Sequence, residues 1–195
     1  MLHCGFGSAT LRDGAAIAAA CVAGGAMAGC RVLLAGGLGG GLPRPCDAAC
    51  DAADGDAIDP CDAAVFYLQE APHDWLLPRC AVVLHHAGAG TCHAALHAGT
   101  PQVLCPLQYD QPYWARRMHS LGVAPPPLDM IEDFTAGSVA AAVRRALSEP
   151  ICSRAAKLAD ELALEADGAA VAAEFISAYV PAAREKSKRQ RAEPR

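Results

Sequence analysis

The sequence has little positive charge for its length. Its 195 residues include 16 Lys and Arg against 21 Asp and Glu, which gives a formal net charge of −5. General nucleic-acid binders need a basic surface, because they must displace counterions from the phosphates. The basic residues gather only in the tail, REKSKRQRAEPR. This balance argues against a nucleic-acid partner.

The sequence also lacks the cysteine pairs that are typical of structural zinc sites. None of its ten cysteines forms a Cys-x-x-Cys pair, and the nearest spacing, Cys46 to Cys50, has no matching second pair. Most of the cysteines lie in alanine-rich or apolar runs, whereas disulfide scaffolds are short secreted chains. We therefore expect reduced thiols and a cytoplasmic protein, with peripheral membrane association as an open alternative.

A long run of strongly apolar side chains is missing as well. Residues 14–30 carry no charge, but they are mostly Ala and Gly, which drive membrane insertion poorly compared with Leu, Ile and Phe. Asp13 and Arg31 flank this stretch as they would an ordinary helix. We expect a helix packed on a sheet here, rather than a transmembrane segment or a signal peptide.

Short apolar runs alternate with helical patterns along the chain. The runs predict strands at 2–4, 31–35, 64–68, 81–85, 102–105 and 122–124. The patterns between or after them predict helices at 13–28, 91–98, 111–121, 135–148, 153–166 and 169–179. Because the strands have no polar face, this alternation predicts an α/β fold with a parallel sheet covered on both sides. Segment 36–62, rich in Gly, Asp and Cys, is predicted to be a long surface loop.

The densest set of chemical groups lies in residues 81–117, AVVLHHAGAGTCHAALHAGTPQVLCPLQYDQPYWARR. A predicted strand ends at His85 or His86, and Gly88 and Gly90 lead into a helix starting near Thr91. Unpaired N–H groups at such a helix start favour an anion, as does the helix dipole. Thr91 and His86 add side-chain donors. The alternative is that the glycines merely turn the chain.

Two further features fit a ligand at the same edge of the sheet. A second glycine turn, GFGS at residues 5–8, follows the first predicted strand, and two such turns offer a place for a diphosphate-sized ligand. Asp110 and Gln111 follow a later apolar strand, and a carboxylate beside an amide suits adjacent sugar hydroxyls. A helix cap is the alternative role of Asp110.

A zinc site is the competing interpretation of the same region. His93 and His97 lie four residues apart on one helical face, with His85, His86 and Cys92 close in sequence. No Asp or Glu lies within that run to act as a base or a further ligand, and the helix is alanine-rich. We therefore expect no metal site.

Four spaced motifs occur together, in one order, within residues 71–123: Pro-His-Asp-Trp, His-His-x-Gly-x-Gly-Thr, Ala-Gly-x-Pro-Gln and Asp-Gln-x-x-Trp-Ala-x-Arg. This order strongly resembles the donor-binding half of UDP-glycosyltransferases of the GT-B fold. It looks closest to sterol 3-beta-glucosyltransferases and related bacterial antibiotic glycosyltransferases. The resemblance covers residues 1–180 and is poorest over 36–62. It implies a Rossmann-like donor-binding domain over 1–180. The charged composition of residues 181–195 predicts a disordered tail.

The resemblance assigns roles to the matching residues. The residues that would hold the diphosphate of the UDP-sugar are His86, Gly88, Gly90 and Thr91, with Ser8 assisting. The sugar hydroxyls would be held by Asp110 and Gln111. The uracil would lie along Pro72, His73 and Trp75. In plant relatives a Glu contacts the ribose, and Ala94 takes its place here, which leaves that contact open.

The activity that the resemblance implies is transfer of a hexose, with glucose expected, from a UDP-sugar to a hydroxyl of a sterol, another lipid or a small molecule. Similar enzymes use no metal or other cofactor and invert the sugar carbon. They deprotonate the acceptor with a histidine of the acceptor-binding half, which is expected upstream of Met1. Two alternatives remain: a donor-binding subunit with a separate acceptor-binding chain, or a non-catalytic nucleotide-sugar-binding remnant.

Overall fold

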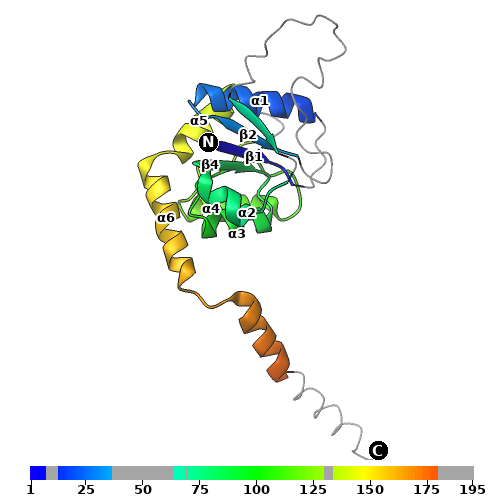
Figure 1. Ribbon diagram of the computed structural model, residues 1–195, viewed down its shortest axis with the longest axis vertical. Helices are drawn as coiled ribbons and strands as arrows, with labels where there is room; N and C mark the ends of the chain where they lie inside the picture. Colours follow the sequence, from blue (N-terminus) through cyan, green and yellow to red (C-terminus); the bar gives the residue numbers. More distant parts are fainter. Residues whose placement is uncertain (8–12, 37–63, 69, 130–133, 180–195) are drawn as a thin grey trace, which may run out of the picture. The chain divides into compact units, whose positions relative to one another are not determined.

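The computed structural model describes residues 1–7, 13–36, 64–68, 70–129 and 134–179. In this part of the chain five strands form one parallel sheet in the order β3-β2-β1-β4-β5 (Figure 1). The strands are β1 (Leu2–Gly5), β2 (Val32–Ala35), β3 (Val65–Leu68), β4 (Val82–His85) and β5 (Gln102–Leu104). The prediction of a parallel sheet is therefore confirmed.

The strands are mostly apolar because both faces of the sheet are covered, and their polar residues His3, His85 and Gln102 are buried. Side chains that alternate along each strand enter different clusters: Leu2 and Cys4 contribute to a core on one face, whereas Val83 packs with Leu77 and Ala95 on the other. A strand buried on both faces has no place for a polar stripe.

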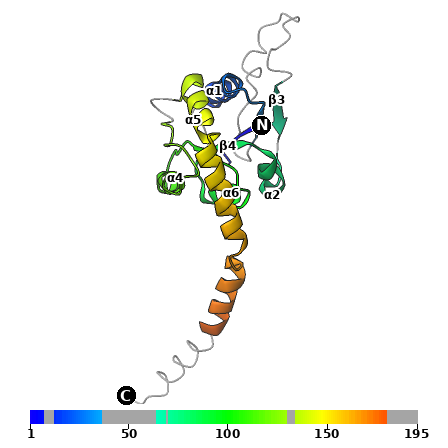
Figure 2. The ribbon, with the colours of Figure 1, turned by 90° about the vertical axis from the view of Figure 1, so that its left-hand side faces the viewer.

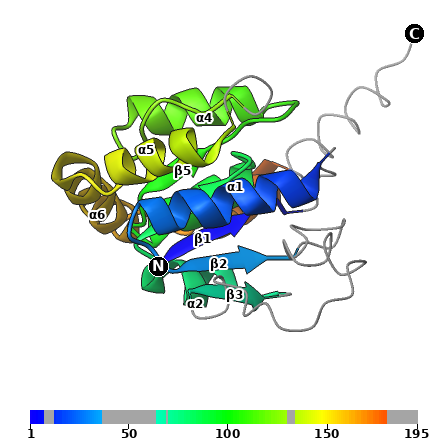
Figure 3. The same cartoon turned by 90° about the horizontal axis from the view of Figure 1, so that it is seen from above.

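One face of the sheet is covered by α1 (Gly14–Met27) and α5 (Ala136–Ala146), which pack against each other (Figure 3). The Asp13 carboxylate caps α1 by accepting a hydrogen bond from the N–H of Ala16 at 3.0 Å. Thr135 and Ser138 form a reciprocal capping box at the start of α5. The uncharged Ala- and Gly-rich stretch is thus a helix on the sheet, as expected. The described residues contain no helix long and apolar enough to span a membrane.

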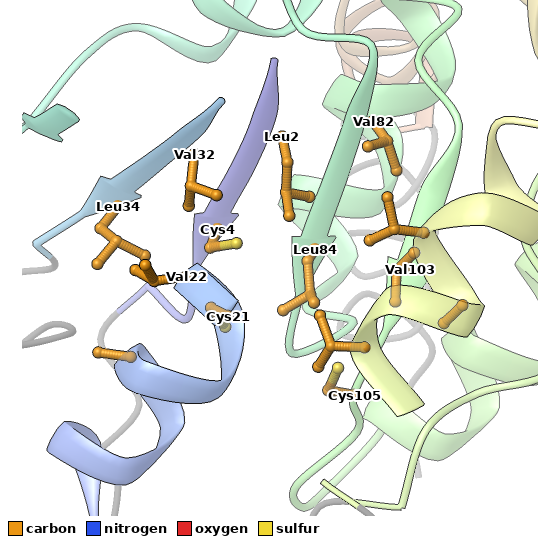
Figure 4. Close-up of a cluster of buried hydrophobic side chains, with 14 of the residues drawn as sticks. Leu2, Cys4, Cys21, Val22, Val32, Leu34, Val82, Leu84, Val103 and Cys105 are labelled. Carbon is orange, nitrogen blue, oxygen red and sulfur yellow. The ribbon is translucent and has the colours of Figure 1, made fainter. Parts of the chain in front are cut away.

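Close-packed side chains of β1, β2, β4, β5 and α1 fill the space beneath these two helices (Figure 4). Cys4, Cys21 and Cys105 are part of this core and act there as small apolar side chains. Burial raises the pKa of the Cys4 and Cys105 thiols well above the usual value. All seven cysteines in the described ranges are free, which agrees with the expectation of reduced thiols.

The opposite face carries α2 (His73–Leu76), the 3-10 helix η2 (Leu77–Arg79), α3 (Ala89–His97) and α4 (Gln111–Ser120). Figure 1 shows α2, α3 and α4 on this side of the sheet, and Figure 2 shows α2 and α4 from another direction. The longer α6 (Glu149–Ala163) adds Ala155 to the cluster that α3 and α4 form with β5. This arrangement leaves the carboxyl ends of β1 and β4 at the edge where α3 begins.

The strand predicted at 122–124 is wrong. Gly122 has a φ of 77°, and the N–H of Val123 donates to the Met118 carbonyl at 3.3 Å, which closes the end of α4. Val123 still accepts a hydrogen bond from the N–H of Gln102 at 3.0 Å, but no ladder follows. Val123 and Ala124 are apolar because they are buried in a cluster with α3, α4 and α6.

One helix was not predicted, and two predicted helix starts are wrong by two residues or more; α6 starts at Glu149 rather than at 153. The helix that was not predicted is the short α2, which follows Pro72. The helix predicted to start near Thr91 starts at Ala89, with Gly88 as its N-cap. Gly90 is therefore inside the first turn of α3 rather than before it.

The chain divides into two compact units, Met1–Leu162 and Ala163–Arg195. All strands and the residues around the β1 and β4 turns belong to the first unit. In the second unit residues 168–179 are helical. The predicted loop at 36–62 lies outside the described residues apart from Gly36, as does the predicted tail at 181–195.

Candidate functional site

The strand order reverses direction between β1 and β4. From β1 the chain proceeds to β2 and β3 on one side, and β4 and β5 then extend the sheet on the other side. Ligands of open parallel sheets bind at such a reversal, beyond the carboxyl ends of the strands. Gly5 at the end of β1 pairs with His85 at the end of β4, so the two glycine turns predicted at one edge are indeed neighbours.

The ring of His86 lies between these two turns. Gly7 has a φ of 57°, and a Cβ atom built there would be 3.1 Å from Cε1 of His86. A Cβ atom at Gly88 would be only 2.5 Å from Nε2 of the same ring. A side chain at position 88 would therefore displace the His86 ring, and at position 7 the positive φ favours glycine and the ring has little space to spare. Ser8, the other residue predicted here, lies outside the described residues.

The imidazole of His86 is half-buried, and one of its nitrogens is buried without a partner. Nδ1 has no hydrogen bond within the described part of the chain. Burial lowers the pKa of His86, and the nearby Asp110 carboxylate opposes this shift. The neutral imidazole therefore predominates at pH 7, with one N–H group to donate.

The start of α3 is open. Gly88 provides no side-chain cap, and the first intrahelical bond runs from the N–H of Cys92 to the Gly88 carbonyl at 2.9 Å. The N–H groups of Ala89, Gly90 and Thr91 thus have no acceptor within the helix. A Cβ atom built at Gly90 meets nothing within 4 Å. No side chain of the described residues caps the helix start or fills the position of a Cβ atom at Gly90, so the N–H groups and dipole of α3 are available to an anion.

Asp110 stands immediately before α4 and is exposed. Its carboxylate does not cap the helix; it accepts a hydrogen bond from the indole N–H of Trp114 at 2.8 Å. The Asp110 carboxylate also opposes the lowering of the His86 pKa and adds to the burial that raises the pKa of Cys92, which places it near the start of α3. The carboxylate is therefore held in one orientation on the side of the His86 turn.

Gln111 is buried, and its amide oxygen is occupied by the chain itself. The oxygen accepts hydrogen bonds from the N–H groups of Leu107 and Gln108, at 2.8 and 2.9 Å. The amide nitrogen is consequently the group that Gln111 offers to a ligand. Tyr109, just before this pair, has a φ of 57° and an exposed side chain, so the turn leading into α4 is sharply defined.

Trp114 is a residue of this site that sequence reasoning missed. Besides holding Asp110, its ring meets the rings of His93 and Tyr113 edge-on, each at a centroid distance of 5.3 Å. The signal was present, because Asp110 and Trp114 are four residues apart at a helix start and such pairs share a face.

Of the residues predicted to lie along the uracil, Pro72, His73 and Trp75, one lies close to strand β1. His73 begins α2 and lies 6.4 Å, between ring centroids, from His3 of β1. Burial lowers the pKa values of His3 and His85, and electrostatic interaction with His73 is a smaller contribution. Pro72, the N-cap of α2, is exposed, and the exposed Trp75 is covered by the guanidinium of Arg79 at 4.7 Å. His73 is thus the member of this group that the structure brings toward β1 and β4.

The competing zinc interpretation finds no support in the geometry. Across the described ranges no three His, Cys, Asp or Glu side chains are grouped so that they could hold a metal ion. His93 faces Trp114, and Cys92 is buried with its pKa raised to about 12, chiefly by burial. A thiol of this kind is a poor metal ligand, because metals bind the thiolate.

Comparison with known proteins places this geometry in a family. Residues 48–178 match the family described as Erythromycin biosynthesis protein CIII-like, C-terminal domain. A sterol 3-beta-glucosyltransferase of Arabidopsis thaliana is 38% identical over 121 residues, 62% of this chain and 19% of that protein. Vancomycin aglycone glucosyltransferase of Amycolatopsis orientalis is 42% identical over 122 residues, 62% of this chain and 29% of that protein.

Solved structures agree on the fold. Spinosyn rhamnosyltransferase SpnG, complexed with thymidine diphosphate, superposes with a TM-score of 0.65 and 20% identity, over 89% of this chain and 44% of that one. The chain thus spans less than half the length of the relatives it matches. The match over residues 48–178 shows that the chain belongs to the EryCIII-like C-terminal domain family, and its parallel sheet agrees with the fold of the solved structures.

Proposed function

We propose that this chain is the donor-binding part of a glycosyltransferase that transfers a hexose, with glucose the first candidate, from a UDP-sugar to a hydroxyl of a sterol, another lipid or a small molecule. The observation that carries the proposal is the open start of α3 beside His86, where the β1 and β4 turns meet. Free N–H groups and a helix dipole suit a diphosphate. Glucosyltransferases among the relatives support the choice of sugar.

The diphosphate would lie against His86, Gly88, Gly90 and Thr91. As the bond between the sugar and the diphosphate breaks, negative charge grows on the departing phosphate oxygens. Donors that are already oriented stabilise this charge without reorganisation. The neutral imidazole of His86 donates one hydrogen bond, and the N–H groups of α3 donate others. No metal or other cofactor is required in this scheme.

The sugar would be held by Asp110 and Gln111. The fixed carboxylate of Asp110 accepts from sugar hydroxyls, and the amide nitrogen of Gln111 donates to one. The base would extend along Pro72 and His73 toward Trp75. Deprotonation of the acceptor hydroxyl needs a general base within hydrogen-bond reach. We assign this general base and the acceptor-binding site to a second region, in the same polypeptide or in a partner chain.

Calorimetric titration of UDP and UDP-glucose into the 195-residue chain tests this proposal. His86→Ala should weaken UDP binding by about 1–3 kcal/mol, the range for a hydrogen bond to a charged group. His97→Ala is the matched control, because that exposed histidine lies at the other end of α3. Addition of EDTA should leave the affinities unchanged. A wild-type chain that binds neither nucleotide would refute the function, and unchanged affinity in His86→Ala would remove His86 from the site.

A further inference from the structure

Ala87 has an unusual backbone conformation for its residue type. Its φ is 62°, and Tyr109 is the other residue besides glycine with a positive φ in the described ranges. An L residue pays a steric penalty in this left-handed region. Ala87 is also fully buried, directly between His86 and Gly88. Surrounding contacts must therefore hold it there.

The contact that holds Ala87 comes from His85, two residues before it. The N–H of Ala87 donates to Nδ1 of His85 at 3.2 Å. Because an N–H group can only donate, Nδ1 must be unprotonated, and the ring proton must be on Nε2. That nitrogen lies 3.0 Å from Oε1 of Gln102, which accepts the proton's hydrogen bond. Each of these groups has one consistent orientation.

Gln102 connects the hydrogen-bonded His85 and Ala87 to the first residues of α3. Its amide nitrogen donates to the Cys92 carbonyl in the first full turn of α3, at 3.4 Å, and approaches Sδ of Met118 at 3.6 Å. The hydrogen bonds of one side chain on β5 thus reach both Ala87, through His85, and Cys92. The residues between them include Gly88, Gly90 and Thr91, the proposed phosphate contacts.

The two side chains are sealed from solvent. His85 and Gln102 are both 0% exposed. Burial lowers the pKa of His85 to about 3, so the ring stays neutral at physiological pH. A ring that titrated would lose the acceptor at Nδ1 and release the N–H of Ala87.

We propose that His85 and Gln102 are positioning residues: they hold Ala87 in the left-handed conformation and thereby aim His86 and the free N–H groups of α3 at the phosphates. This inference rests on the proposed function, since the phosphates are those of the nucleotide sugar. His85 itself is too deeply buried to touch a ligand. It acts through the turn.

Glycine at position 87 provides the decisive test, because glycine adopts a positive φ without penalty. The four chains to compare are wild type, His85→Leu, Ala87→Gly and the double variant. His85→Leu should weaken UDP binding about tenfold, the equivalent of losing support for one left-handed residue. The double variant should bind UDP within about threefold of Ala87→Gly alone, since the turn no longer needs the support. If His85→Leu weakens UDP binding equally in the wild-type chain and in the Ala87→Gly chain, the proposal is overturned.

Binding of uridine separates positioning from general damage. Uridine has no phosphate, so His85→Leu should leave its affinity, measured by NMR titration, unchanged. Thr100→Val is the matched control: it deletes another buried hydrogen bond on this face, from the Thr100 hydroxyl to the Leu77 carbonyl at 2.8 Å. It should leave both affinities unchanged. Equal weakening of UDP and uridine in His85→Leu would contradict a positioning role.

One measurement needs no variant and remains decisive if His85→Leu fails to fold. Nitrogen NMR of the wild-type chain reports which ring nitrogen of His85 carries the proton. We expect it on Nε2 from pH 5 to pH 8, and a proton on Nδ1 would overturn the proposal. A wild-type chain that shows this tautomer yet does not bind UDP would refute the proposed function and the aim at phosphates, while leaving the support of Ala87 in place.

Discussion

Asp110 and Gln111 are adjacent in sequence, but their side chains make different contacts. Asp110→Asn should weaken UDP-glucose binding by about 1.5–3 kcal/mol, because a hydrogen bond to a charged group is lost. UDP binding should hardly change, since UDP has no hexose. The asparagine oxygen can still accept from the Trp114 indole, so the local structure is retained. Calorimetry with both nucleotides measures the difference, and equal weakening of the two would place Asp110 away from the sugar.

Gln111 allows a matched pair of substitutions. Gln111→Glu keeps an oxygen for the N–H groups of Leu107 and Gln108 but removes the amide donor. It should weaken UDP-glucose binding by about 1 kcal/mol with little loss of stability. Gln111→Leu also leaves two N–H groups without their acceptor and should lower the free energy of unfolding by about 1–3 kcal/mol. Urea denaturation distinguishes them; equal stabilities would show that the oxygen does not support the turn.

For single residues, the sequence predicted which residue types form the site better than it predicted their contacts. The spacing of His86, Gly88 and Thr91 could be recognised, because these residues are close in the chain. The pairing of His85 with Gln102 could not, since 17 positions separate them and only the adjacency of β4 and β5 joins them. The sequence also could not predict that the side-chain oxygen of Gln111 accepts hydrogen bonds from N–H groups of its own turn, because these bonds depend on the path of the backbone.

At the scale of elements, the start of α3 decides what the edge of the sheet can bind. Gly88→Ala places a Cβ atom 2.5 Å from Nε2 of His86, so the ring must move. The φ of Gly88 is −64°, which alanine adopts readily, so the fold should persist. We expect at least tenfold weaker UDP binding, or about 1.4 kcal/mol, at nearly unchanged stability.

Gly90→Ala is the companion to this substitution. Its Cβ atom meets nothing in the free protein, and alanine stabilises a helix by up to about 1 kcal/mol relative to glycine. This variant should be at least as stable as wild type in thermal unfolding. If Gly88→Ala binds UDP as tightly as wild type does, His86 is not held between the turns for a ligand.

The type and order of most elements could be predicted from apolar runs and breakers, but the boundaries could not. Gly88 and Gly90 suggested a turn that ends before Thr91, whereas the helix tolerates Gly90 in its first turn because the position is exposed and unconstrained. Val123 and Ala124 suggested a strand because burial against helices and burial within a sheet leave the same apolar signal.

For the whole molecule, two buried histidines make stability depend on pH. Burial is the main cause that lowers the pKa of His3 to about 4 and that of His85 to about 3. The usual value of 6.5 applies in the unfolded chain, which therefore binds protons that the folded chain does not as the pH falls below about 6.5. Each histidine should reduce the free energy of unfolding by up to about 1.4 kcal/mol per pH unit in this range.

Urea denaturation at pH 7.5 and at pH 5 measures this effect. His3→Phe should make the dependence about half as steep, and it also removes a buried nitrogen without a partner in the described part of the chain. Equal stability of the wild type at the two pH values would show that the histidines are not neutral and buried as described.

The sequence alone predicted an α/β sheet and, through its spaced motifs, the family, but not the order of strands. Spacing does not show that β1 lies between β2 and β4, and this order is what brings the turn at Gly7 against the ring of His86. The site is thus a property of the topology, assembled from segments about eighty residues apart.

The central claim is that the N–H groups opening α3 bind the phosphates of a sugar nucleotide. Two-dimensional NMR of the nitrogen-labelled chain, titrated with UDP, observes these groups directly. We expect the amide signals of Ala89, Gly90 and Thr91 to shift among the most on addition of UDP and barely to move with uridine. Saturable UDP binding that leaves those three signals in place would contradict it.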